Sequence, residues 1–147
     1  MALVLNEEQV MLRDAAAGFL AEKATISHLR DLRDSGDEHG FDAEVWREMT
    51  DMGWAGIAIP EAFGGLGYGY TGLGLVLEQA GRNLSASPLQ SSVLVAATVI
   101  GELGSASQKE ALLPAIAAGE TLVSLALQEA PHHAPLHCAM SASKAGD

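Results

Sequence analysis

The sequence is poor in cysteine and in basic residues. Its 147 residues include one cysteine, Cys138, and eight lysines and arginines against nineteen aspartates and glutamates, which gives a formal net charge of −11. A single cysteine excludes an intrachain disulfide and suits a reducing compartment. Scattered basic residues and a negative net charge argue against binding to nucleic-acid phosphates and to anionic membranes. We therefore expect no nucleic acid and no membrane among the partners of this protein.

Long apolar runs are also missing. The strongest run, residues 93–100, is far shorter than the roughly 20 residues that a membrane-spanning helix needs. The N-terminal residues lack the basic start and the apolar stretch of a signal peptide, so we expect a cytoplasmic protein. What the chain does contain is 48% apolar and only 18% charged residues, which is enough apolar surface for a folded core in one ordinary domain.

Capping signals and apolar residues at helical spacing predict a bundle of about six helices in the first 120 residues. Capping boxes are predicted at Asn6 and at Ser107, since each is followed by a glutamate or glutamine at a suitable spacing. Asp42 is a predicted N-cap, and Pro88 is placed to be a first helical residue. The predicted helices cover roughly residues 7–23, 26–33, 42–52, 73–81, 87–103 and 107–119.

A glycine-rich stretch, residues 53–67, separates the charged N-terminal helices from the apolar helices that follow. Residues 67–72 match the pattern G-x-G-x-x-G, which can bind a dinucleotide when a strand lies directly before it and an acid about 20 residues after it. Here a loop containing Pro60 precedes the pattern, and residue 92 is a serine. We therefore favour a structural corner, held by Trp54 and Pro60, in which glycines permit left-handed turns.

The character of the sequence changes after Glu120. A short apolar run at residues 122–127 lies between Gly119 and Pro131 and predicts a strand, and a second strand is predicted near His137. One or two strands do not form a stable sheet. We therefore expect residues 121–147 to be the incomplete beginning of a β domain, and the chain to be a fragment of a longer protein.

Histidines and the cysteine gather in this last part of the chain. His132, His133, His137 and Cys138 allow two interpretations, a metal site or a polar loop. Their spacing matches that of zinc ligands only loosely, and adjacent histidines in extended chain point to opposite faces. We favour the polar loop and predict no metal site.

Three motifs follow one another along the chain, in an order and at spacings that fit one family. They are Gly53-Trp54-x-Gly56-Ile57-x-x-Pro60-Glu61-x-x-Gly64-Gly65-x-Gly67 with Glu78-x-x-Gly81-Arg82, then Gly104-Ser105-x-x-Gln108-Lys109-x-x-x-Leu113-Pro114-x-Ile116-Ala117-x-Gly119-Glu120, then Ala126-Leu127-Gln128-Glu129. Together they resemble the N-terminal domain of flavin-dependent acyl-CoA dehydrogenases and the start of that family's middle β domain. The resemblance covers nearly the whole chain.

The resemblance implies a mainly α fold, with a helical domain at residues 1–120 and the beginning of the middle β domain at residues 121–147. It implies an FAD-dependent enzyme, a dimer or tetramer, that oxidises an acyl-CoA to the 2,3-enoyl-CoA and passes electrons to an electron-transfer flavoprotein. The family's catalytic glutamate belongs to the C-terminal domain, so that no catalytic residue is expected in this chain. The 147 residues would supply scaffold and one wall of the acyl pocket, and would be inactive alone.

The resemblance also implies positions for the site. Substrate contacts would come from the helix after Pro88, at Gln90, Ser91, Ser92 and Val95, where small side chains leave room for a large or branched acyl group. Flavin contacts would come from Leu127, Gln128 and Glu129. The family usually reads Leu-Thr-Glu-Pro-x-x-Gly-Ser-Asp here, whereas this chain has Gln128 in place of the hydroxyl residue and no Gly-Ser-Asp. This departure leaves a second interpretation, a non-catalytic partner subunit of a mixed tetramer with a degenerate flavin site.

Overall fold

The computed structural model describes residues 4–129, 131, 134 and 136–143, and over these residues the chain is helical, with no strand. The α-helices of this part are α1 (Glu7–Lys23), α2 (Ile26–Ser35), α3 (Ala43–Asp51), α4 (Gly69–Asn83), α5 (Ala97–Leu103) and α6 (Ala106–Ala117). Two 3₁₀ turns, η1 (Trp54–Gly56) and η2 (Glu61–Phe63), follow α3, and a π-helix, η3 (Leu89–Ala96), runs directly into α5. The predicted helical bundle is confirmed.

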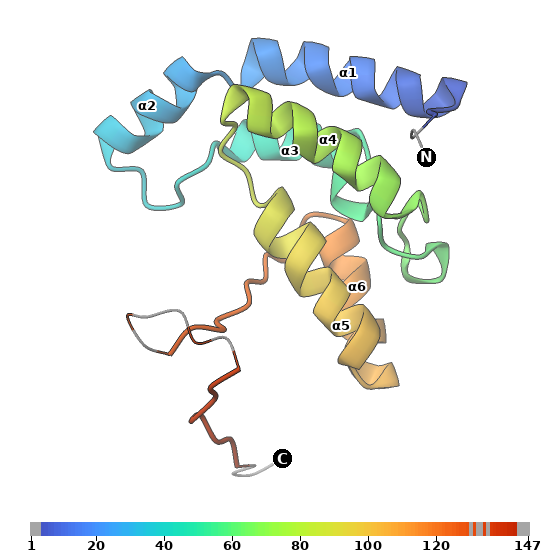
Figure 1. Cartoon of the computed structure of the whole chain (residues 1–147), viewed down its shortest axis with the longest axis vertical. Coiled ribbons are helices and arrows are strands. Elements are labelled where there is room, and N and C mark those ends of the chain that lie inside the picture. Colours follow the sequence, from blue (N-terminus) through green and yellow to red (C-terminus); the bar gives the residue numbers. More distant parts are fainter. Residues whose placement is uncertain (1–3, 130, 132–133, 135, 144–147) are drawn as a thin grey trace.

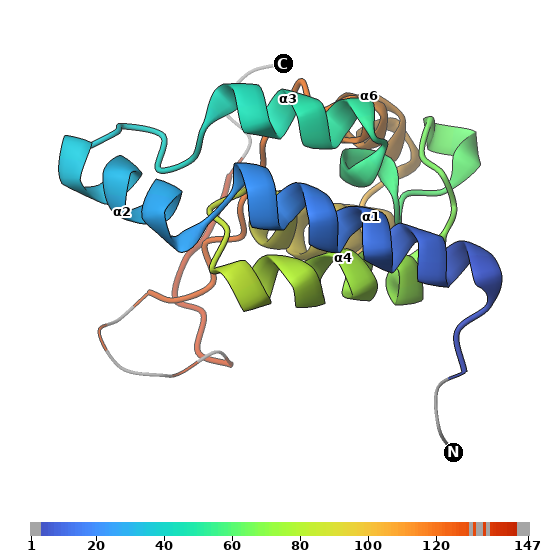
Figure 2. The same ribbon diagram turned by 90° about the horizontal axis from the view of Figure 1, so that it is seen from above.

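The helices pack in two groups. Helix α1 lies along α4, with α3 nearby, and α2 projects to one side of this group (Figures 1 and 2). Helices α5 and α6 lie side by side on the face away from α1 (Figure 1). The helix formed by η3 and α5 therefore connects the two groups, and the chain after α6 leaves the bundle along the start of η3.

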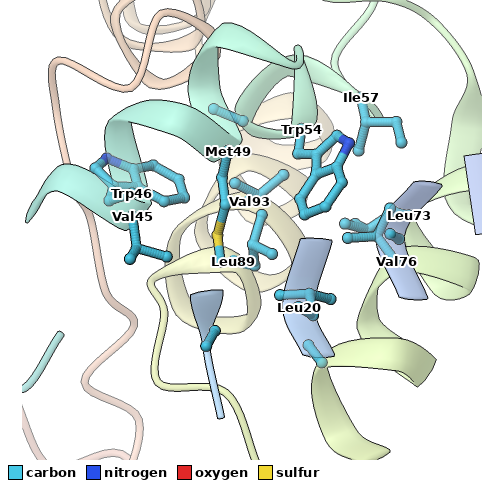
Figure 3. Close-up of a cluster of buried hydrophobic side chains, with 14 residues drawn as sticks. Leu20, Val45, Trp46, Met49, Trp54, Ile57, Leu73, Val76, Leu89 and Val93 are labelled. Carbon is cyan, nitrogen blue, oxygen red and sulfur yellow. The ribbon is translucent and has the colours of Figure 1, made fainter. Parts of the chain in front are cut away.

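The larger of two apolar clusters lies between α1, α3, α4 and η3. Leu20, Met49, Leu73 and Leu89 are completely buried there (Figure 3). The rings of Phe19 and Trp54 meet edge to face, with their centroids 5.4 Å apart. A smaller cluster between α5, α6 and the glycine-rich corner contains Ile59, Ala97, Leu113 and Ile116. Apolar burial of this extent is the main stabilising contribution to such a bundle.

Several helix ends agree with the sequence and others do not. Pro88 was predicted to be the first helical residue, but it is the N-cap of η3, which begins at Leu89 and has no side-chain capping bond. Asn6 and Gln9 form the predicted capping box of α1, and Asp42 caps α3 through the N–H groups of Glu44 and Val45. The second capping box is formed by Ser105 with Gln108, so the prediction at Ser107 was wrong by two residues. Helix α4 does not stop at Gly81 but continues to Asn83. It ends there because Leu84 adopts the left-handed conformation, with φ of 50°.

The glycine-rich corner closes on itself through its own backbone. The N–H groups of Leu66, Gly67 and Tyr68 donate to the carbonyl oxygens of Gly56, Ile59 and Ile57, each at 2.9 Å. A Cβ on Gly65 would lie 2.0 Å from the carbonyl oxygen of Ile59. Since these amides are used inside the corner, they are not available to cradle a phosphate, which agrees with the structural interpretation.

The strands predicted after Glu120 are not formed among the described residues. Residues 121–129 form neither helix nor strand and are largely exposed, and residues 136–143 are exposed and begin in a turn, where the N–H of His137 donates to the carbonyl of Ala134. A strand exists only when a neighbouring strand satisfies its backbone groups. The apolar pattern of residues 122–127 is therefore that of a strand without a partner in the part of the chain that the structure describes.

Candidate functional site

Residues 121–129, the segment that follows α6, pass the start of η3, and a pocket of about 340 Å³ opens between them. Its lining comes from both elements: Ser87, Gln90, Ser91, Val95, Ser124 and Leu125. Three of the four side chains predicted to contact substrate thus lie together at one opening. The helix and the segment are about thirty residues apart in the sequence, so the fold is what creates this pocket.

A second hollow of about 260 Å³ adjoins the first and shares Ser87, Ser91 and Ser124 with it. Its far wall is formed by residues 39–41, in the loop between α2 and α3. This wall was not predicted, because a solvated loop carries no sequence pattern that places it opposite a distant helix. Ser124 and Leu125 were not predicted either, although their place just before Leu127 could have indicated them.

The π-helical conformation of η3 sets the shape of the pocket wall. The N–H of Ala97 donates to the carbonyl of Ser92, five residues earlier, which widens the helix compared with an α-helix. Gln90 and Ser91 are exposed at its first turn, and Ser91 Oγ donates to the carbonyl of Pro88 at 3.3 Å. Short π-helical segments are frequent at functional sites.

Ser92 is placed differently from its three predicted companions. It is 1% exposed, so it lies beneath the pocket and does not line it. Its Oγ accepts a hydrogen bond from the N–H of Val123 at 3.1 Å. Ser92 therefore contacts the extended segment that forms the opposite wall.

The predicted flavin contacts lie farther along the same segment, where Leu127, Gln128 and Glu129 are all exposed. The Glu129 carboxylate accepts the N–H groups of Ala139 at 2.6 Å and Met140 at 2.9 Å. These two bonds, the one from Ala139 first, hold the pKa of Glu129 below its ordinary value. The carboxylate is thus turned toward residues 138–140 and closes a loop.

The predicted polar loop can be followed only in part, because His132 and His133 lie outside the described residues. Within those residues no group of three histidine, cysteine or acidic side chains is arranged to hold a metal ion. Cys138 is exposed, with Sγ 3.5 Å from Glu129 Oε1. Across the described part of the chain, no helix is both long and apolar enough to cross a membrane.

Residues 6–120 match the family model described as acyl-CoA dehydrogenase, N-terminal domain. The chain belongs to the acyl-CoA dehydrogenase family. Among curated relatives it is 32% identical over 129 residues to the acyl-CoA dehydrogenase FadE12 of Mycobacterium tuberculosis, covering 87% of this chain and 32% of that protein. The chain thus spans about a third of the length of the curated relatives it matches.

Two solved structures have the same fold. One is a variant of the Tcur3481-Tcur3483 steroid ACAD, with a TM-score of 0.74, 37% identity, and coverage of 84% of this chain and 33% of the other. The other is the ChsE4-ChsE5 complex from Mycobacterium tuberculosis, with a TM-score of 0.79, 28% identity, and coverage of 91% and 36%. The recognition of the family from three sequence motifs is therefore confirmed.

Proposed function

We propose that this chain is part of an FAD-dependent acyl-CoA dehydrogenase and supplies scaffold and one wall of its acyl pocket. In this proposal residues 1–120 are the helical N-terminal domain and residues 121–147 begin the middle β domain. The whole protein, located in the cytoplasm, would oxidise an acyl-CoA to the 2,3-enoyl-CoA and pass electrons to an electron-transfer flavoprotein. The observation that carries the proposal is the pocket that joins Gln90, Ser91 and Val95 to Ser124 and Leu125.

The lining of this pocket suits the acyl part of a thioester. Val95 and Leu125 are apolar, while Ser87, Ser91 and Ser124 are small, so the walls leave room beside a hydrocarbon chain. Among the described residues no lysine or arginine lines the pocket, and phosphate groups such as those of coenzyme A are usually bound by such residues. The pocket therefore fits the acyl group, in particular a large or branched one, and not the nucleotide end.

FAD would be held farther along the segment. At Leu127 and Gln128 the chain is exposed and forms neither helix nor strand, which suits backbone contacts to the edge of a planar ring. The Glu129 carboxylate fits less well, because two backbone amides already occupy it. When bound, FAD would take up the hydride removed from the acyl group. The residues of this chain bind and orient, and we assign none of them as the catalytic base.

The proposal is tested on the whole protein, purified with any subunits that accompany it. Its visible spectrum reports a bound flavin, and anaerobic addition of acyl-CoAs of increasing size reports reduction as bleaching of that spectrum. We expect a yellow protein that is bleached by an acyl-CoA and not by free coenzyme A. A flavin-containing protein that no acyl-CoA bleaches would contradict the proposal.

A second candidate function is that of a non-catalytic subunit in a mixed assembly. The engagement of Glu129 by the loop at residues 138–140 favours it, because this carboxylate is then withdrawn from a flavin site. The similarity to a structure that contains two named proteins, ChsE4 and ChsE5, also favours it. A colourless protein that copurifies with a yellow acyl-CoA dehydrogenase subunit would support this candidate over the first.

A further inference from the structure

Ser92 is an unusual residue for the interior of this bundle. Among the described residues, only Gln79 and Ser92 are polar and buried, and Ser92 is 1% exposed. Its neighbours on the helix, Val93 and Ala96, are core residues. A hydroxyl group in such surroundings is costly unless it is hydrogen-bonded. The helix alone would be as well served by alanine, since serine has the lower helix propensity.

The bond that satisfies Ser92 ties two distant parts of the chain together. Its Oγ accepts the N–H of Val123, which lies 31 positions later, at 3.1 Å. The Val123 side chain is half-buried against the smaller apolar cluster. Figure 1 shows the segment passing the start of η3 after it leaves α6. Val123 is thus held by its backbone on η3 and by its side chain on α5 and α6.

This contact is the last hydrogen bond between the bundle and the segment before the proposed flavin contacts. Upstream, Trp46 Nε1–H donates to the carbonyl of Gly119 at 3.3 Å, and the N–H of Thr121 donates to the carbonyl of Ala115. Among the described residues, 124–127 make no hydrogen bond to the helices. The position of these residues therefore depends on the anchor at Val123.

A slip of the segment would change the pocket. Ser124 and Leu125 line the pocket, so a shift of the segment by one residue along η3 would put one of their neighbours, Val123 or Ala126, into the lining. The same shift would move the backbone of Leu127 and Gln128 by more than 3 Å, roughly the rise per residue of extended chain. One buried hydrogen bond thus controls the register of both sites.

On this basis, which rests on the proposed function, we propose that Ser92 is a positioning residue. It touches neither acyl group nor flavin. It fixes the register of residues 121–129 against η3, and through that register the acyl-chain specificity of the pocket. This role differs from the substrate contact that the sequence analysis predicted for it.

The first arm of the test measures amide hydrogen exchange in the purified protein. Ser92→Ala removes the acceptor and keeps a good helix former, so the bundle should fold. We expect the amide of Val123, which loses its acceptor, to exchange about tenfold faster, the effect of one ordinary hydrogen bond on an equilibrium constant. Ser92→Cys, with a weaker acceptor of similar size, should fall in between. Unchanged exchange in Ser92→Ala would overturn the inference.

The matched control is Ser85→Ala. Ser85 Oγ also makes a long-range hydrogen bond, donating to the carbonyl of Ala24 at 2.8 Å, but it joins α1 to the end of α4. This variant should lose stability as Ser92→Ala does, without faster exchange at Val123. Equal acceleration of the Val123 amide in both variants would show a general loosening and would overturn the positioning role.

The second arm compares kcat/KM for short and for bulky acyl-CoAs. We expect Ser92→Ala to change the ratio of the two values by about tenfold, whereas Ser85→Ala leaves it unchanged. An unchanged ratio in an active Ser92→Ala protein would overturn this inference alone. Wild-type protein that oxidises no acyl-CoA would overturn the proposed function instead, and the exchange arm would still decide whether Ser92 fixes the register.

Discussion

Leucine side chains are buried in the helical part of the chain and exposed in the segment after Glu120. Leu73 and Leu89 in the helices are completely buried, whereas Leu122, Leu125 and Leu127 in the segment are 43%, 45% and 52% exposed. Helices satisfy their backbone groups internally and can pack at once, but extended chain needs a neighbour first. The helical part therefore supplies stability, and the segment presents exposed apolar surface.

The carboxylates of Asp42, in the helical part, and Glu129, in the segment, show the same contrast. Asp42 and Glu129 each accept two backbone N–H groups, and these bonds hold the pKa of both below the ordinary carboxyl value. Asp42 caps α3, which contributes Val45, Trp46 and Met49 to the core. Glu129 closes a loop on the exposed segment. The same chemistry thus stabilises the bundle in one place and only a local turn in the other.

The largest expected effect is that of a cavity in the bundle. Leu73→Ala should lower the free energy of unfolding by about 2–5 kcal/mol, because the surrounding helices cannot close over the lost side chain. Leu127→Ala, its counterpart in the segment, should change that free energy by less than about 0.5 kcal/mol. Denaturant titration followed by circular dichroism measures both, and similar losses in the two variants would contradict the division of roles.

The next effect concerns the glycine-rich corner that carries the chain to α4. Gly65→Ala should cost about 1–3 kcal/mol, since its Cβ would collide with the carbonyl of Ile59. Gly74→Ala is the control, because Gly74 is exposed within α4 and has open space around its Cβ position. That variant should gain up to about 1 kcal/mol. Thermal unfolding distinguishes the two variants, because the melting temperature should fall in Gly65→Ala and rise in Gly74→Ala.

A smaller loss is expected for the N-cap of α3. Asp42→Ala should cost about 1 kcal/mol at neutral pH. The N–H of Val45 is the main cause that lowers the pKa of Asp42 in the folded protein. The contribution of Asp42 to the free energy of unfolding is therefore complete above the ordinary pKa of 3.8, and it is lost as pH falls through the lower pKa of the folded state. Unfolding free energies measured from neutral to strongly acidic pH should converge for wild type and variant, and a constant difference would contradict this explanation.

The smallest effect on unfolding is expected in the segment. Glu129→Ala should leave the unfolding of the bundle unchanged but speed amide exchange at Ala139 and Met140, which lose their acceptor. The pKa of Glu129 lies below its ordinary value of 4.5, so in the wild type the protection of these amides, measured against their intrinsic exchange rates, should be lost only as pH falls below that value. Glu120→Ala is an exposed control for the charge change. Destabilisation of the bundle by Glu129→Ala would show that the segment belongs to it.

Much of the bundle could be predicted, because its signals are local. Asn6 with Gln9 and Asp42 bear their capping groups within three residues of the backbone they satisfy, and both are seen as predicted. Leu84 could not be predicted as a helix end, since a left-handed leucine is held by its surroundings and not by its own preference. Ser105 was missed because a second serine, Ser107, lies two positions later and is also followed by an acid or amide three residues on.

The site was harder to predict because it depends on contacts across the fold. Gln90, Ser91 and Val95 were named from the family resemblance and do line a pocket. The π-helix that shapes this wall has no signature in the sequence. The bond from Val123 to Ser92 also could not be foreseen, because nothing near Ser92 in the sequence distinguishes a buried acceptor from a pocket-lining hydroxyl.

The most direct test of the account is the acyl-CoA profile of the whole protein with Val95 replaced by phenylalanine. Val95 lines the pocket, whereas Leu103, at the far end of the same helix, is 82% exposed and provides the control Leu103→Phe. Kinetics with acyl-CoAs of increasing size should show kcat/KM for bulky substrates reduced by about tenfold or more in Val95→Phe, with short substrates retained and the control unchanged. Equal loss for all substrates, or none, would contradict the assignment of this pocket to the acyl group.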